Sequence, residues 1–340
     1  MKQIKGNICK LLVMILVMLS IVSYGAEKSA KKPSVVITLA TGMSEDHAAN
    51  IAFKKFIKTI EEKSNGEMTG ILYPNNQLGG DVVAMQGTQD GSIVMCWSTT
   101  ANQVSLIPEL AIFDIPFMYD NLEHAIKAMN NEEFLNKIQE KFNAAGLHCA
   151  GVTPTGFRWL SANKEIHKLE DLKGLKIRTM ENAYHIAAWK ALGVTPTPLA
   201  NSERYAALQQ GTVDGQENAM ENAYSTKMYE VQKVFINTQH ICYLSSWAMN
   251  KDFYDKLSPE HKAIFDEAME ICVKEAQKAT IENEEQLLKS LESMGKTVIR
   301  SLDPGENDRW RKIAQPAAED LVRKNIGNEM IDILHKAVGK

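Results

Sequence analysis

The chain has 340 residues, of which 44% are hydrophobic and 24% are charged, and its formal net charge at pH 7 is −4. This length allows two compact units, each with its own core. The acidic balance, without a cluster of Lys and Arg, excludes nucleic acid as the expected partner.

The first residues have the pattern of an export signal. Three lysines within the first ten residues precede the apolar run 11–22, and the small residue Gly25 follows. The run is too short for a membrane-spanning helix, so we predict a cleaved signal peptide of residues 1–25 and a periplasmic mature protein. Cleavage after Ala26 and an uncleaved anchor are the alternatives. Cys9 precedes the apolar run, which argues against a lipid-attachment cysteine.

The residues after this leader alternate between strand-like and helix-like segments. Strands are expected at 34–39, 67–73, 93–97 and 147–152, and helices at 44–66 and 82–89. Ser44 is the expected N-cap of the first helix. The alternation of strand and helix indicates a parallel, doubly wound α/β sheet.

A second unit repeats this alternation and is followed by one very long helix. Strands are expected at 175–178, 194–198, 212–216 and 241–249, and helices at 183–192 and 202–210. Ser258 and Pro259 then start a helix that nothing interrupts before Gly295. Its ends are apolar and its middle is polar, so we expect it to bridge two lobes rather than form a coiled coil.

These segments predict two lobes followed by a C-terminal helical segment. The predicted boundaries are 32–155 plus 243–283 for lobe I, 156–242 plus 284–312 for lobe II, and 313–340 for the C-terminal segment. The run 241–249 would return the chain to the first lobe. An exported protein with two lobes and crossing strands favours a ligand cleft at the lobe boundary.

Motifs for metal, cofactor or catalysis are absent from the sequence. Four of the five cysteines follow the leader, at spacings that fit no metal or redox motif (Cys96, Cys149, Cys242 and Cys272). Buried single thiols are expected, and one disulfide stays open as an alternative. Without a phosphate loop, a dinucleotide motif, a zinc-protease motif or a nucleophile elbow, we expect a binding protein with no cofactor and no metal.

Two arginines are the strongest candidates for a binding site. Arg158 follows an apolar run, and Arg178 ends the strand-like segment 175–178. A guanidinium is a fixed fork of donors that matches a carboxylate with two parallel hydrogen bonds. The pair therefore indicates an anion site. The alternative is pairing with a structural acid such as Glu170, Asp171 or Glu181.

Four motifs in order give the chain a family resemblance. They are NQLG at 76–79, FDIPF at 113–117, DLKGLKIR at 171–178, and the run 206–218 that ends in GQEN. With these motifs the chain resembles the extracytoplasmic solute receptors of TRAP (tripartite ATP-independent periplasmic) transporters. The resemblance covers nearly the whole mature chain. It implies a two-lobed α/β fold of the type II periplasmic binding protein kind, with a long helix spanning both lobes.

The resemblance also implies a function and roles for three residues. Receptors of this family bind organic acids in the interlobe cleft and deliver them to a membrane permease driven by an ion gradient, commonly sodium. Arg178 would make the paired contact to the ligand carboxylate, and Arg158 would assist it. Asn218 would be a ligand or near-ligand residue. We expect a monomer whose lobes close around the ligand.

Five further residues are weaker substrate-binding candidates. His47 starts a helix near the end of the first strand, and Trp97 and Ser98 follow a strand end where ligands collect. Asn201 precedes a helix and could instead be a cap. Glu217, beside Asn218, fits a polar cleft wall, and an acid pair with Asp214 is the alternative. His47 and Trp97 could equally be a solvated helix start and a core residue.

Departures from the family pattern bear on the substrate. Sialic-acid receptors of this family carry an aromatic residue where this chain has Asn201, and a Val-Pro pair where it has Thr179 and Met180. A smaller, more hydroxylated acid is therefore expected, such as a hexuronate or an aldonate. A C4-dicarboxylate or sialic acid is the alternative ligand. A sensor kinase or an ATP-driven permease is the alternative partner.

Overall fold

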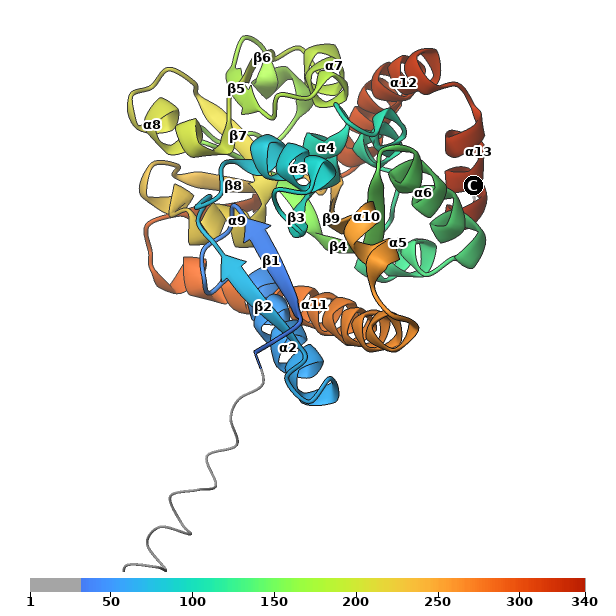
Figure 1. The fold of residues 1–340 in the computed structure, drawn as a ribbon. Helices are drawn as coiled ribbons and strands as arrows, with labels where there is room; N and C mark the ends of the chain where they lie inside the picture. The colour runs from blue at the N-terminus through green and yellow to red at the C-terminus, as the bar shows by residue number, and fades with distance from the viewer. Residues whose placement is uncertain (1–31, 340) are drawn as a thin grey trace, which may run out of the picture.

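The computed structural model describes residues 32–339, apart from the side chain of residue 285, and the predicted signal peptide lies outside them. Within this range ten strands form a sheet in the order β2-β1-β3-β9-β4-β7-β5-β6, with β8 beside β4 and β10 beside β8. Figure 1 shows the helices packed around these strands. One long strand, β4, belongs to both halves of the sheet, so the fold is a two-lobed α/β structure.

The first lobe combines parallel and antiparallel strands. Its strands are β1 (Val35–Thr41), β2 (Met68–Tyr73), β3 (Met95–Thr99), β9 (Cys242–Asn250) and the first part of β4 (Leu147–Ala162). β1 is parallel to β2 and β3, whereas β9 is antiparallel to β3 and β4. The expectation of a parallel sheet is therefore wrong in this respect, because the long strand β4 pairs antiparallel with each of its neighbours.

The second lobe begins within β4. Phe157 still pairs with Cys242 of β9, and the next residue, Arg158, pairs with Ala219 of β7. The strands of this lobe are β5 (Lys176–Thr179), β6 (Thr195–Pro198), β7 (Gly215–Ala219), β8 (Val234–Asn237) and β10 (Val298–Ser301). Arg158 therefore lies where β4 passes from one lobe to the other.

The helices expected at 44–66, 82–89, 183–192 and 202–210 are present with shifted ends, and further helices that were not predicted lie between them. They are α2 (Ala48–Lys63), α3 (Asp81–Asp90), α4 (Thr100–Gln103), α5 (Leu122–Met129), α6 (Glu132–Ala144), α7 (Ala183–Ala191), α8 (Arg204–Gln209), α9 (Met220–Ser225), α10 (Lys251–Lys256), α11 (Pro259–Ser293), α12 (Glu306–Ile326) and α13 (Glu329–Val338). Short 3-10 turns are η1 (Pro108–Asp114), η2 (Leu169–Leu172), η3 (Asn201–Glu203) and η4 (Met228–Glu230). The N-cap predicted for α2 is wrong: His47 caps it, with Nδ1 accepting from the Ala49 N–H at 3.1 Å, while Ser44 donates to Asp46.

Helix α11 joins the two lobes, as expected from its apolar ends. Its 35 residues span about 52 Å at 1.5 Å per residue. Phe265 and Cys272 pack into a core with α2, β1 and β3, whereas Leu291 packs beside Trp159 and Phe235 of the second lobe. Figure 1 shows α11 passing α2 near one end and α9 near the other.

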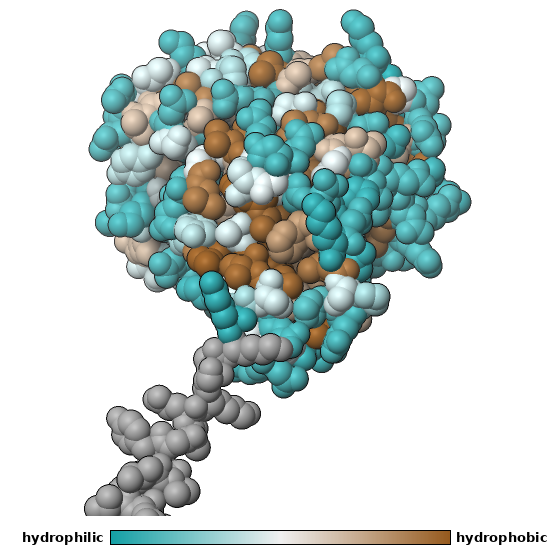
Figure 2. All heavy atoms as spheres, viewed as in Figure 1, coloured by the Kyte–Doolittle hydropathy of each residue, from teal (hydrophilic) through white to brown (hydrophobic). Residues whose placement is uncertain are grey.

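The four cysteines after the leader are free, three of them buried and Cys149 half-buried. Figure 2 shows hydrophilic side chains around one face of the molecule and apolar ones gathered near its middle, over β1, β2 and α3. Val82 and Val83 of α3 are 43% and 56% exposed. Between residues 32 and 339, no helix combines the length and the apolar character that a membrane span needs.

Candidate functional site: a polar cavity between the lobes

A cavity of about 340 Å³ lies between the lobes, which is within the range of small-molecule sites. The second lobe lines it with mostly polar side chains (Arg178, Glu181, Asn201, Ser202, Asn218 and Asn222). The first lobe contributes three polar residues and three apolar ones (Asn76, Asp81, Asn102, Met43, Val82 and Val83). Tyr243, near the start of β9, lines the cavity as well. The cavity therefore has a cationic and amide-rich wall that faces a mixed one.

Arg178 is held at the cavity by a backbone carbonyl. The residue lies on β5, is only 2% exposed, and donates from Nε and Nη2 to the carbonyl oxygen of Leu199. Its Nη1 has no hydrogen-bond partner within residues 32–339. Burial lowers the pKa of Arg178 to about 10, with Glu217 opposing and the charge of Arg158 adding to this shift. Since the guanidinium stays charged at neutral pH, its free edge is a fixed donor for an anion.

Arg158 lies behind the cavity and is paired with an acid. Its Nε donates to Glu217 at 2.5 Å, and its Nη2 donates to the other carboxylate oxygen at 2.8 Å. Burial opposes the charge, but Glu217 outweighs burial and raises the pKa of Arg158. Nη1 donates to Oδ1 of Asn218 at 3.2 Å, so Arg158 reaches the cavity through that amide. The acid partner is Glu217, and not one of the three acids considered from the sequence.

Glu217 occupies the centre of a buried network rather than the cavity wall. Besides Arg158, its carboxylate lies 3.0 Å from Nε2 of His240 and 3.9 Å from Nδ1 of His185. Burial opposes ionisation, but Arg158 and the two histidines outweigh it and hold the pKa of Glu217 well below its usual value. The alternative of an acid pair is not observed, because Asp214 is exposed and accepts from the N–H of Lys176.

The remaining predicted site residues are divided between the cavity and the core beneath it. Asn201 and Asn218 line the cavity. His47, Trp97 and Ser98 are buried in the first lobe, where the rings of His47 and Trp97 lie 5.4 Å apart. None of these three lines the cavity, and their contact with a ligand stays a prediction.

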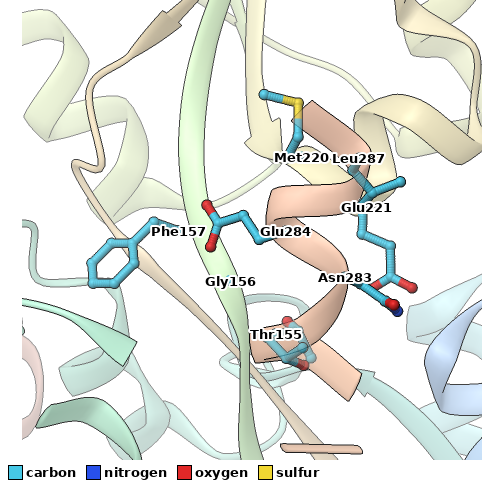
Figure 3. Close-up of a pocket in the computed structure, with 9 residues that line it drawn as sticks. Thr155, Gly156, Phe157, Met220, Glu221, Asn283, Glu284 and Leu287 are labelled. Carbon is cyan, nitrogen blue, oxygen red and sulfur yellow. The ribbon is translucent and has the colours of Figure 1, made fainter. Parts of the chain in front are cut away.

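Glu221 of α9 links the two lobes at His47. Its carboxylate accepts from the N–H of Ala48 at 3.0 Å and lies 3.6 Å from Nε2 of His47. Figure 3 shows Glu221 beside Asn283 of α11, at a small cavity that also includes Glu284. That cavity measures about 10 Å³, which is no more than one water molecule occupies. The cavity at Arg178 is the candidate ligand site, because a buried guanidinium with an unbonded Nη1 lines it.

Family comparison identifies the protein class. Residues 39–325 match the family model of the bacterial extracellular solute-binding proteins, family 7. The chain belongs to this family. It is an extracytoplasmic solute receptor of the TRAP type, a class of binding proteins and not of enzymes. Receptors of this class are periplasmic, bind organic acids and work with membrane permease components.

Three relatives of the receptor illustrate the range of the family. A sugar-acid-binding protein from Advenella mimigardefordensis, solved with galactonate, has a TM-score of 0.85 and 28% identity, over 91% of this chain and 98% of that one. The 2,3-diketo-L-gulonate-binding periplasmic protein of Escherichia coli is 31% identical over 76% of this chain and 79% of its own length. The C4-dicarboxylate-binding periplasmic protein of Rhodobacter capsulatus is 28% identical over 90% and 92%.

The receptor also places residues at the cavity that the sequence analysis did not single out. Asp81 lies in the first turn of α3 and accepts from Nδ2 of Asn102 at 2.7 Å. Burial raises the pKa of Asp81, and the bond from Asn102 opposes that shift. Asn222 lies in α9, four residues after Asn218 of β7, and its closeness to the GQEN motif could have indicated it. Tyr243 carries no comparable signal, because its place depends on the pairing of β9 with distant strands.

Proposed function

We propose that this receptor binds the carboxylate of a sugar acid in the interlobe cavity, with Arg178 as the anchor. The observation that carries the proposal is a buried guanidinium whose Nη1 has no partner and which lines a 340 Å³ cavity. A carboxylate that leaves water needs charge-assisted donors in fixed geometry. Because the Leu199 carbonyl occupies one edge of Arg178, the edge formed by Nη1 and Nη2 is left for the ligand.

The predicted site residues take two kinds of role in this proposal. Asn201 and Asn218 touch the ligand directly, since they line the same cavity as Arg178. Arg158 and Glu217 act from behind, because the hydrogen bond of Arg158 to Asn218 fixes that amide. His47, Trp97 and Ser98 are buried in the first lobe, and the ligand contacts them when the lobes close.

The polar lining of the cavity favours a hydroxylated acid as the ligand. Amides both donate and accept hydrogen bonds, so the cluster of asparagines at the cavity can satisfy several hydroxyl groups at once. Asp81 on the opposite wall accepts from hydroxyls and repels a second carboxylate. The galactonate-bound and 2,3-diketo-L-gulonate-binding relatives are consistent with a hexuronate or aldonate ligand. A C4-dicarboxylate would place its second charge against Asp81.

The remaining steps of transport follow from the class. We infer that residues 1–25 are removed on export, and that the mature receptor acts as a monomer in the periplasm. The loaded receptor then delivers its acid to the small and large membrane subunits of a TRAP permease. The lobe boundaries predicted above would be the two rigid bodies that move on closure.

Two measurements test the proposal: identification of the bound acid, and comparison of the acids that stabilise the protein. Native mass spectrometry of the purified protein should detect a bound hexuronate or aldonate. A thermal-shift panel of these acids, succinate and sialic acid should then show stabilisation that grows as RT ln(1 + [L]/Kd), about 2.7 kcal/mol at one hundred times Kd. Stabilisation by succinate alone or by sialic acid alone would reject the substrate class.

Asp81→Asn tests the exclusion of dicarboxylates. Removing the negative charge should improve succinate affinity relative to an aldonate by about ten-fold, which corresponds to about 1.4 kcal/mol. Isothermal titration calorimetry of the two acids against wild type and variant measures this ratio. Glu181→Gln, at the edge of the same cavity, is the control for a general loss of negative charge. An unchanged ratio in Asp81→Asn would contradict the assigned role.

A further inference from the structure

Arg204, at the start of α8, is a buried arginine that has no acid partner among the described residues. Its side chain is fully buried and donates only to neutral oxygens. Nη1 donates to Gln216 at 3.1 Å, and Nη2 donates to Asn222 and Thr226, each at 2.6 Å. Its Nε has no partner. A buried charge normally requires a counter-charge, so this arrangement needs a reason.

The surroundings of Arg204 add positive charge rather than removing it. Within residues 32–339, Glu217 is the carboxylate that bonds to one of the three buried arginines, and it bonds to Arg158. Arg178 and Arg204 therefore have no carboxylate in contact. Burial, followed by the charges of Arg178 and Arg158, lowers the pKa of Arg204 well below its usual value. The wall behind the cavity thus holds more positive than negative charge.

Arg204 also sets the direction of an amide at the cavity. Oδ1 of Asn222 accepts from Nη2 of Arg204 and from Nδ2 of Asn218, at 2.6 and 3.1 Å. With its oxygen held in this way, Asn222 has only the sulfur of Met43, at 3.9 Å, near its Nδ2. Asn222 lines the cavity, so the NH₂ group is the end available to a ligand.

We propose that Arg204 is a specificity-determining positioning residue, which turns the Asn222 amide into a donor toward the cavity and supplies a buried positive charge that the bound acid balances. This inference rests on the proposed function and deepens it. The site then recognises an acid through two donors: Arg178 binds the carboxylate, and Asn222 binds an acceptor oxygen of the same molecule. Neutral analogues such as lactones are disfavoured, because they leave the charge of Arg204 unbalanced.

The first experiment uses the ligand-free protein and needs no knowledge of the acid. Asn222→Asp places a carboxylate against the unpaired guanidinium, so it should raise the Tm by about 2 °C or more. In an Arg204→Met background the same Asn222→Asp change should lower the Tm, because the new carboxylate is then buried without a partner. If Asn222→Asp changes the Tm with the same sign in both backgrounds, the proposed charge balance is wrong. It is also wrong if Arg204→Met lowers the Tm as much as Arg158→Met does.

The second experiment measures affinity for the hexuronate or aldonate that most stabilises the wild type in the thermal-shift panel. Arg204→Met and Asn222→Asp should each weaken binding at least about ten-fold, even though Asn222→Asp stabilises the ligand-free protein. Unchanged affinity in either variant would overturn the specificity role. If the wild type binds none of these acids, the proposed function fails, and the Tm sign reversal still decides whether Arg204 carries an unbalanced charge.

Discussion

Arg178→Lys and Arg178→Ala are the most direct tests of the anchor. The Leu199 carbonyl accepts from Nε and Nη2, which leaves three of the five N–H groups of Arg178 without a bond to it. Lysine has no fork that can bridge the carbonyl and a carboxylate together, so one charge-assisted hydrogen bond is lost. Such a bond contributes about 1.5–3 kcal/mol, which predicts a loss of about ten- to 150-fold in affinity. Alanine removes both bonds and should lose the square of this factor.

The measurement is isothermal titration calorimetry with the acid found in the purified protein. Arg309 offers a matched control, since it is 44% exposed and paired with Glu170 on the surface of the second lobe. Arg309→Ala should leave affinity unchanged within about two-fold, because an exposed pair contributes little. If Arg178→Ala is folded and binds the acid as the wild type does, the anchor lies elsewhere and the reasoning about its free edge is wrong.

Three other changes test the buried network and the packing of the two lobes. Glu217→Gln should lower the free energy of unfolding by about 3–5 kcal/mol in urea titrations, because it leaves a buried guanidinium unpaired, whereas Glu170→Gln on the surface should lower it by about 1 kcal/mol or less. Burial lowers the pKa of His148 to about 4, so the unfolded chain binds the proton first and stability falls as pH drops from 6.5 toward 4. His148→Phe should abolish up to about 3 kcal/mol of that fall. In Gly215→Ala the new Cβ would lie 2.4 Å from the backbone oxygen of Ser161, and equal stability would contradict a predicted loss of about 1–3 kcal/mol.

Local sequence pattern predicted most of the strands and the long helix. It did not predict how the strands pair with distant parts of the chain. The long helix was predictable because Ser258 and Pro259 mark its start and the apolar residues recur at both ends. The length of β4 was not, because Pro154 and Gly156 interrupt the apolar run in the sequence. In the structure a register shift between Pro154 and Phe157 absorbs both residues, and the strand continues into the second lobe. Such a shift depends on pairing with β9, which lies far away in the sequence.

The same limit applies to the candidate site. Positions that depend on neighbouring residues could be predicted, whereas contacts between distant residues could not. The position of Arg178 at the cavity was predictable, because Arg178 lies near the carboxyl end of a strand, where cavities of α/β sheets form. Arg158 was a candidate from the sequence, but its pairing with Glu217, which is 59 residues away, could not be predicted. Arg204 lies in a short polar helix and resembles a solvent-exposed residue in sequence. Its burial follows from the packing of α8 against β7 and α9, which no local pattern records.

The fixed donors also explain why a receptor of this kind can bind a strongly hydrated acid. The Leu199 carbonyl already orients Arg178, and the buried network already orients Asn218, so little side-chain freedom is lost on binding. In the proposed function, the unbalanced positive charge destabilises the ligand-free protein, and the same charge becomes favourable once a carboxylate enters. Because these groups are buried, dissolved salt screens them much less than it would screen surface lysines. If the proposed function holds, affinity and charge selectivity have one origin, which is a cationic wall that folding assembles before the ligand arrives.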